Sequence, residues 1–128
     1  MDPAFAIAVD PRRSLLRITL SGFFQLEDVA RFAERKRFAH AELRCPPNRH
    51  VTLADVSACK IQPQTVVGAF AGLIGDPRYR ARRIAFVTGS SLASMQVRRL
   101  INGAADMRLY ADPELAEAWL LEPGVEAA

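Results

Sequence analysis

One short run of residues constrains the fold more than any other feature of the sequence. Arg83-Ile84-Ala85-Phe86-Val87-Thr88 is strongly apolar and shows no alternation between apolar and polar side chains. Such a strand is expected in the centre of a parallel sheet, where both of its faces are buried. It follows a clear helix stop signal, Gly75-Asp76-Pro77, and precedes another predicted helix. The sequence therefore predicts an α/β fold with a mostly parallel sheet.

Apolar periodicity and helix-cap residues predict the other elements around this central strand. Strands are predicted at residues 5–9, 15–20, 51–56, 83–88 and 107–110. Helices are predicted at residues 26–40, 63–75 and 91–103 and from residue 113 onward, with Leu26 and Leu115 among their core-facing side chains. The first two strands are joined by a short turn and should form an antiparallel hairpin. The expected architecture is a single mixed, mostly parallel five-stranded sheet with helices, in the order β-β-α-β-α-β-α-β-α with right-handed crossovers.

The length and composition indicate one domain without disulfides. The chain has 128 residues, half of them hydrophobic, which is enough to bury a core. We expect a single domain over residues 1–128, with its core at about 5–121 and a frayed tail at 122–128. No apolar run reaches membrane-helix length and no secretory signal is visible, so a cytoplasmic location without membrane association is expected. Cys45 and Cys59 should then remain reduced.

The charge distribution is uneven along the chain. All 17 basic residues and nine of the 14 acidic ones lie at or before Arg108, which gives residues 1–108 a net charge of +8 and the remainder −5. Most of the arginines fall at the strand-amino end of the predicted sheet, where helices end and cations stabilise helix dipoles. This structural role explains the basic cluster better than a nucleic-acid surface does, and we expect no nucleic-acid partner.

The sequence shows no catalytic, metal or cofactor motif. His40, Cys45, His50 and Cys59 do not have the spacing of a compact metal site. No nucleophile elbow, phosphate-binding loop or dinucleotide fingerprint is present. We therefore expect no enzyme activity, no metal and no cofactor.

The strand-carboxyl end of the sheet is the predicted binding end, because ligands of open α/β sheets usually lie there. The candidate surface consists of Phe23, Phe24, Ser57, Gln64, Thr65, Gly68, Gly72, Ser90 and Ser91. Phe23 and Phe24 could be exposed contacts, but a hydrophobic staple or core packing is the preferred interpretation. Gly68 and Gly72 share one stripe of their helix. The stripe could pack tightly against the sheet, which is the preferred interpretation, or form a ligand groove or a contact with a second subunit. A homodimer is plausible on the same grounds.

Three segments of the chain resemble the STAS superfamily. They are Leu53-Ala54-Asp55-Val56-Ser57-Ala58 before a helix, the strand at 83–87, and the ending from Met107 to Leu120. Within the superfamily the chain is most similar to small bacterial SpoIIAA-like proteins of the STAS/SEC14 type. The resemblance covers residues 5–121 and implies the same order of elements.

The resemblance also implies a function class. STAS domains are mostly non-catalytic, and the anti-sigma-factor antagonists among them are phosphorylated by a partner kinase in an Asp-Ser-Ser-Gly-like turn. The corresponding segment here is Pro63-Gln64-Thr65-Val66, which lacks the Asp, the first Ser and the Gly of that turn. Thr65 alone carries a hydroxyl and is the candidate phospho-acceptor that the resemblance implies. The leading hypothesis is a non-enzymatic binding or regulatory module that contacts an unknown protein partner. The alternative is a carrier of a small apolar or lipid-like ligand, suggested by the apolar helix at 63–75.

Overall fold

A computed structural model describes residues 2–89 and 91–123 of the chain. Its strands are β1 (Ala4–Asp10), β2 (Leu15–Gly22), β3 (Val51–Cys59), β4 (Arg83–Val87) and β5 (Met107–Tyr110). Its helices are α1 (Leu26–Glu42), α2 (Gln64–Gly75), α3 (Ser91–Ile101) and α4 (Pro113–Leu120). The predicted order of elements is confirmed. The third strand extends three residues further than predicted, and Pro63 is the cap before α2 rather than its first residue.

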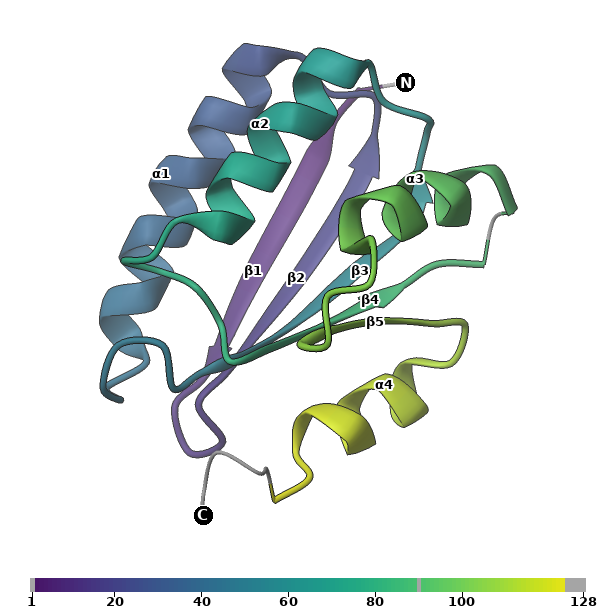
Figure 1. Cartoon of the computed structure of the whole chain (residues 1–128). Coiled ribbons are helices and arrows are strands. Elements are labelled where there is room, and N and C mark those ends of the chain that lie inside the picture. Colours follow the sequence, from purple (N-terminus) through teal and green to yellow (C-terminus); the bar gives the residue numbers. More distant parts are fainter. Residues whose placement is uncertain (1, 90, 124–128) are drawn as a thin grey trace.

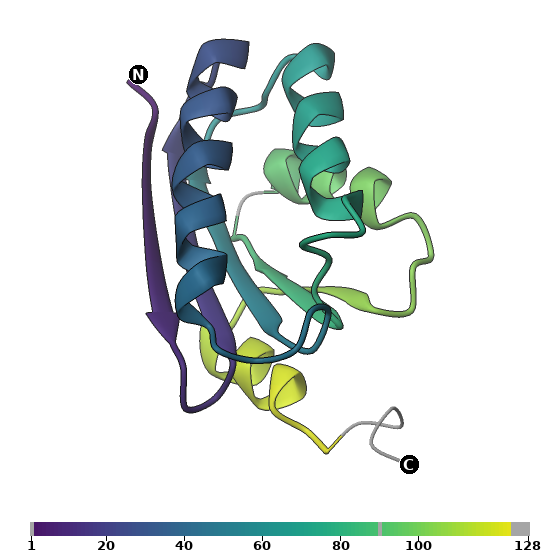
Figure 2. The same ribbon diagram turned by 90° about the vertical axis from the view of Figure 1, so that its left-hand side faces the viewer.

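The five strands form one sheet in the order β1-β2-β3-β4-β5. β1 pairs with β2 in antiparallel fashion, and all other neighbours are parallel. Because each parallel crossover moves to the next position in the same direction, α1, α2 and α3 all lie on one face of the sheet. α4 follows the last strand and lies on the opposite face (Figure 1). α1 and α2 run side by side on their shared face (Figure 2).

The sheet separates two apolar cores. The larger core lies beneath α1, α2 and α3 and includes the buried side chains of Phe24, Phe32 and Val66. The rings of Phe24, Phe70, Phe32 and Phe5 form a chain of edge-to-face contacts with centroids 5.4–5.8 Å apart. The smaller core lies beneath α4. Ile84, Ala85, Phe86 and Val87 of β4 are all buried, as expected for a central strand covered on both faces.

Several apolar side chains that were expected on buried helix faces are exposed, among them Ala30, Ala71 and Ala118. Leu26 is 55% exposed at the start of α1, and Leu115 is 59% exposed on α4. Each lies in the first turn of its helix, and the buried apolar side chains begin further along, at Val29 and Ala116. Ala116, Trp119 and Leu120 provide the buried face of α4 instead.

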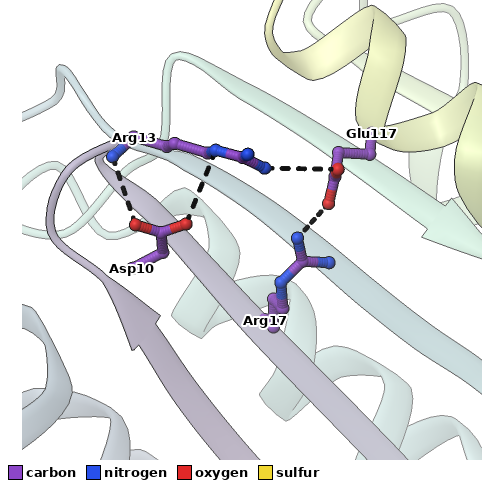
Figure 3. A network of polar contacts seen from close by, with 4 residues as sticks. All are labelled: Asp10, Arg13, Arg17 and Glu117. Carbon is purple, nitrogen blue, oxygen red and sulfur yellow. Dashed lines mark hydrogen bonds and ion pairs between the residues drawn. The ribbon is translucent and has the colours of Figure 1, made fainter.

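Arginines at the strand-amino end hold helix ends and join distant elements. Arg82 and Arg83 donate hydrogen bonds to the carbonyls of Leu120 and Trp119 at the end of α4, which fits the predicted role at helix termini. Arg13 and Arg17 of the first hairpin both form ion pairs with Glu117 of α4, and Arg13 also pairs with Asp10 (Figure 3). This network connects the hairpin to the helix on the opposite side of the sheet from α1.

Candidate functional site

An apolar cavity of about 130 Å³ lies between the sheet and the three helices on its larger face. β2, β3 and β4 form its floor, and α1, α2 and α3 form its walls and roof. Its apolar lining consists of Ile18, Leu20, Phe32, Ala54, Val56, Val67, Phe70, Leu73, Ile74, Ala81, Ile84, Phe86, Val97 and Leu100. A space lined by these side chains offers a ligand dispersion contacts and almost no polar partners.

Polar groups lie at the two ends of the cavity. Lys36, Thr52 and Tyr79 line the strand-amino end, whereas Cys59, Lys60, Gln62 and Gln96 line the strand-carboxyl end. The cavity is therefore apolar along its length and polar at both ends.

Gln62 connects the segments at the strand-carboxyl end. Its side chain accepts a hydrogen bond from the Phe24 backbone and donates to the carbonyls of Gly22 and Lys60. Its backbone exchanges two hydrogen bonds with the Gln96 side chain of α3, each 2.9 Å long. One residue thus joins the loop before α1, the loop before α2 and the middle of α3 at this end of the cavity.

A compact cluster of Lys36, His40, His50 and Tyr79 closes the strand-amino end. Lys36 Nζ lies 2.8 Å from His40 Nε2, and the His40 ring contacts the rings of His50 and Tyr79 at centroid distances of 4.8 and 4.9 Å. Burial lowers the pKa of Lys36 to about 8, although the charge of Asp76 opposes this shift. Burial, reinforced by the charge of Lys36, lowers the pKa of His40 to about 3 and that of His50 to about 4. At neutral pH both imidazoles are therefore neutral, and Lys36 donates to His40.

The ionisable groups offer little for nucleophilic catalysis. Burial, followed by the charge of Asp55, raises the pKa of Cys59 to about 11, so its thiol is protonated at neutral pH. Within residues 2–89 and 91–123, no three His, Cys, Asp or Glu side chains gather to hold a metal ion. Over the same ranges, no helix has the length and apolar character needed to cross a bilayer.

Comparison with known proteins identifies the architecture. No protein-family model and no curated protein sequence matches the chain. A DUF3478-family protein from Shewanella loihica PV-4, described as uncharacterized and as having a SpoIIAA-like fold, aligns over 94% of this chain and 96% of its own, with a TM-score of 0.69 and 18% identity. The chain has a SpoIIAA-like fold. An anti-sigma factor antagonist from Mycobacterium paratuberculosis aligns over 91% of this chain and 94% of its own, with a TM-score of 0.58 and 13% identity.

These neighbours confirm the fold that the resemblance implied. Within the SpoIIAA-like fold, the predicted surface residues can now be located one by one. Phe23 is 41% exposed at the strand-carboxyl end. Phe24 is fully buried in the larger core against Phe70, so its inclusion in the binding surface was wrong and the core-packing interpretation is confirmed. The reason is the helix entry: the Phe24 backbone bonds to Gln62, which turns the ring inward.

The remaining predicted residues divide between two faces of the SpoIIAA-like fold. Gln64, Thr65, Gly68 and Gly72 are all exposed on the outer side of α2. Ser57 is exposed on β3 and donates a 2.6 Å hydrogen bond to Asp55, whereas the alternate residues of that strand line the cavity. Ser57 therefore lies on the other face of the sheet, away from Thr65.

The glycines of α2 do not pack against the sheet. A Cβ built at Gly68 or Gly72 would meet no atom within 4 Å, so the preferred interpretation of this stripe was wrong. Spacing shows that two residues share a face of a helix but not which face is buried, and Val66 and Phe70 occupy the inner side.

Ser90 and the side chain of Ser91 lie outside the described residues. Phosphorylation of Thr65 stays a prediction.

The cavity itself was not predicted from the sequence. Lys36, Gln62 and Tyr79 come from separate segments and meet only in the folded chain. One signal was available: Lys36 and Lys60 are the only lysines beside fifteen arginines, and both line the cavity.

Proposed function

We propose that this chain is a non-catalytic binding module that takes a small apolar ligand into the cavity beneath α2. The observation that carries the proposal is an apolar space of about 130 Å³ in the larger core. An engineered cavity of similar size, about 150 Å³ and lined by Leu, Ile and Phe, stays dry and binds benzene. The space beneath α2 therefore matches an apolar group of about the size of one benzene ring.

The energetic cost of the space supports the proposal. Side chains that line such a space make fewer dispersion contacts than side chains that are packed on all sides. A ligand that fills the space recovers part of this cost through new dispersion contacts. Stability should therefore increase when a ligand of matching size is present.

Filling the cavity by mutation tests the proposal. Ala54 lies on β3 in the cavity floor, and Ala54→Leu adds three carbons where space is available. We expect benzene to raise the melting temperature of the wild-type protein and to leave that of Ala54→Leu unchanged, because the added side chain takes the ligand's place.

Ala30→Leu is the matched control, since it makes the same change at an exposed position of α1 and should preserve the benzene effect. If the wild-type protein shows no benzene effect, or if Ala54→Leu responds like the wild type, the cavity is not the binding site. A native mass spectrum of protein from its own host would then identify any ligand that copurifies.

A second candidate function, protein binding, is favoured by exposed apolar side chains at the strand-carboxyl end. Phe23, Leu26, Ile61 and Met95 are 41–55% exposed there. Large apolar side chains gathered at one end of a domain are typical of interaction surfaces. A double variant, Phe23→Ser with Ile61→Ser, tests this function. In the host, chemical cross-linking should capture a partner protein with the wild type and not with the double variant. The double variant should retain the benzene effect. Retention of the same partner by the double variant would contradict this function.

A further inference from the structure

Lys36 occupies an unusual position for a lysine. It projects from α1 to the strand-amino end of the apolar cavity, which Tyr79 and Thr52 also line, and its Nζ lies 6.0 Å from the centroid of the Tyr79 ring. Its Nζ contacts the neutral imidazole of His40 at 2.8 Å. A chain that uses arginine fifteen times and lysine twice places a compact ammonium group at each end of this cavity.

The ammonium group of Lys36 has no anionic partner of its own. In the part of the chain that the structure describes, no carboxylate lies within 4 Å of Lys36 Nζ. The nearest acidic influence is Asp76, whose carboxylate is engaged by Arg78 at 2.9 Å. A half-buried charge without a counter-ion is costly, and an anion placed beside it would remove much of that cost.

We propose that the cavity's ligand is an amphipathic monocarboxylate, whose carboxylate binds Lys36 and whose apolar part fills the space toward Gln62 and Gln96. This inference rests on the proposed function, because it requires that the cavity hold an apolar ligand. A charge-assisted hydrogen bond from Lys36 would fix the orientation of the ligand, and the apolar lining would supply contact area.

The local charges favour one negative charge over two. His40 and His50 are neutral at pH 7, so Lys36 is the single cation of the cluster. The guanidinium group of Arg78 lies over the Tyr79 ring but is paired with Asp76, so it offers little to the second charge of a dianion such as a phosphate monoester. Lys60 at the opposite end is exposed, so its ammonium group is already solvated and gains little from a ligand carboxylate.

Calorimetric titration with two ligands of nearly the same shape tests the inference. Hexanoate carries the carboxylate, and hexanamide replaces it with a neutral amide. We expect the wild-type protein at pH 7 to bind hexanoate about tenfold or more tightly than hexanamide. Lys36→Met keeps the unbranched stem without the charge, and it should abolish this preference while retaining hexanamide binding. Lys60→Met is the matched control and should leave the preference intact.

The pH dependence gives a second readout. Burial places the pKa of Lys36 near 8, so hexanoate binding should weaken as the pH rises from about 7 to about 9.5, whereas hexanamide binding should not change. Of the groups that face Lys36, His40 and His50 are already neutral over this range, and Asp76 remains ionised.

The outcomes separate the inference from the proposed function. Equal binding of hexanoate and hexanamide would overturn the role of Lys36 and leave apolar ligand binding in place. A preference for hexanoate that survives Lys36→Met but not Lys60→Met would also overturn it, by placing the carboxylate at the other end. If neither compound nor benzene binds, the proposed function and the inference both fail.

Discussion

His50 is 3% exposed, and its Nε2 has no hydrogen-bond partner within the described residues. Its ring contacts that of half-buried His40, whose Nε2 accepts a hydrogen bond from Lys36, so both imidazoles lie beside a positive charge. Burial and that charge keep both rings neutral in the folded protein. In the unfolded chain each would take up a proton near pH 6.5.

This difference predicts a loss of stability in weak acid. Below pH 6.5 the unfolded state binds more protons than the folded state. The free energy of unfolding therefore has its full value above pH 6.5 and decreases as the pH drops toward about 4. For His50 alone, the loss between pH 7 and pH 5 should be about 2 kcal/mol. Urea denaturation at both pH values measures it.

His50→Phe keeps a ring at this position without the titrating group, so its stability should depend less on pH than that of the wild type. Arg49→Gln changes an exposed neighbour and serves as the control. An unchanged pH dependence in His50→Phe would show that His50 is not held neutral by the fold.

At the scale of elements, α2 differs from the other helices because it contains no charged residue. Its inner side contributes Val67, Phe70 and Leu73 to the cavity, and its outer side presents Gly68 and Gly72 to open space. The glycines therefore weaken the helix without serving a contact within the chain, since glycine has a poor helix propensity. A homodimer through this surface stays a prediction.

Gly72→Ala should stabilise the monomeric fold by about 0.5–1 kcal/mol, because alanine restricts the unfolded chain and meets nothing in the folded one. Gly22→Ala is the contrasting variant: Gly22 has a φ of +87°, and a Cβ there would lie 2.3 Å from the Asp2 carbonyl oxygen. It should be strongly destabilising. Thermal and urea denaturation distinguish the two, and a destabilised Gly72→Ala would indicate that a second chain covers this side of α2.

The order of these elements was predictable because its signals are local. Gly75-Asp76-Pro77 ends one helix, Asp112-Pro113 begins another, and the run at 83–88 marks the central strand, each within a few residues. Which apolar residue is buried depends instead on distant partners. Phe23 and Phe24 are adjacent and chemically identical, yet only Phe24 reaches Phe70. The cavity depends on the same kind of long-range packing, and for that reason the sequence did not reveal it.

At the scale of the whole molecule, the sheet isolates the cavity from the core beneath α4. Leu120 is fully buried in that smaller core together with Trp119, which is the single tryptophan of the chain. The guanidinium groups of Arg83 and Arg108 lie over the Trp119 ring at 5.0 and 4.8 Å from its centroid. Trp119 fluorescence therefore reports on the face of the sheet that the proposed ligand does not touch.

Leu120→Ala should reduce the free energy of unfolding by about 2–5 kcal/mol, because it leaves a void in a fully packed core. The folded variant should still show the benzene effect, since the cavity lies across the sheet. Leu115→Ala is the matched control on the same helix: at 59% exposure it should change stability by less than about 0.5 kcal/mol. Urea denaturation followed by Trp119 fluorescence measures both. Loss of benzene binding in folded Leu120→Ala would show that the two cores are coupled.

The sheet order described above bears on how the chain assembles during synthesis. From β2 onward, every strand pairs with the strand that precedes it in the sequence. Each new strand is therefore added at the edge of the sheet, and none has to be inserted between two strands that are already paired. The sheet can therefore grow from the hairpin outward as residues emerge from the ribosome, each new strand pairing with one that is already present. β5 follows β4 in the sequence, and until β5 emerges one side of β4 presents an unpaired edge. Until β5 pairs with it, this edge of β4 can pair with another chain, so the interval between the emergence of β4 and that of β5 carries a risk of aggregation.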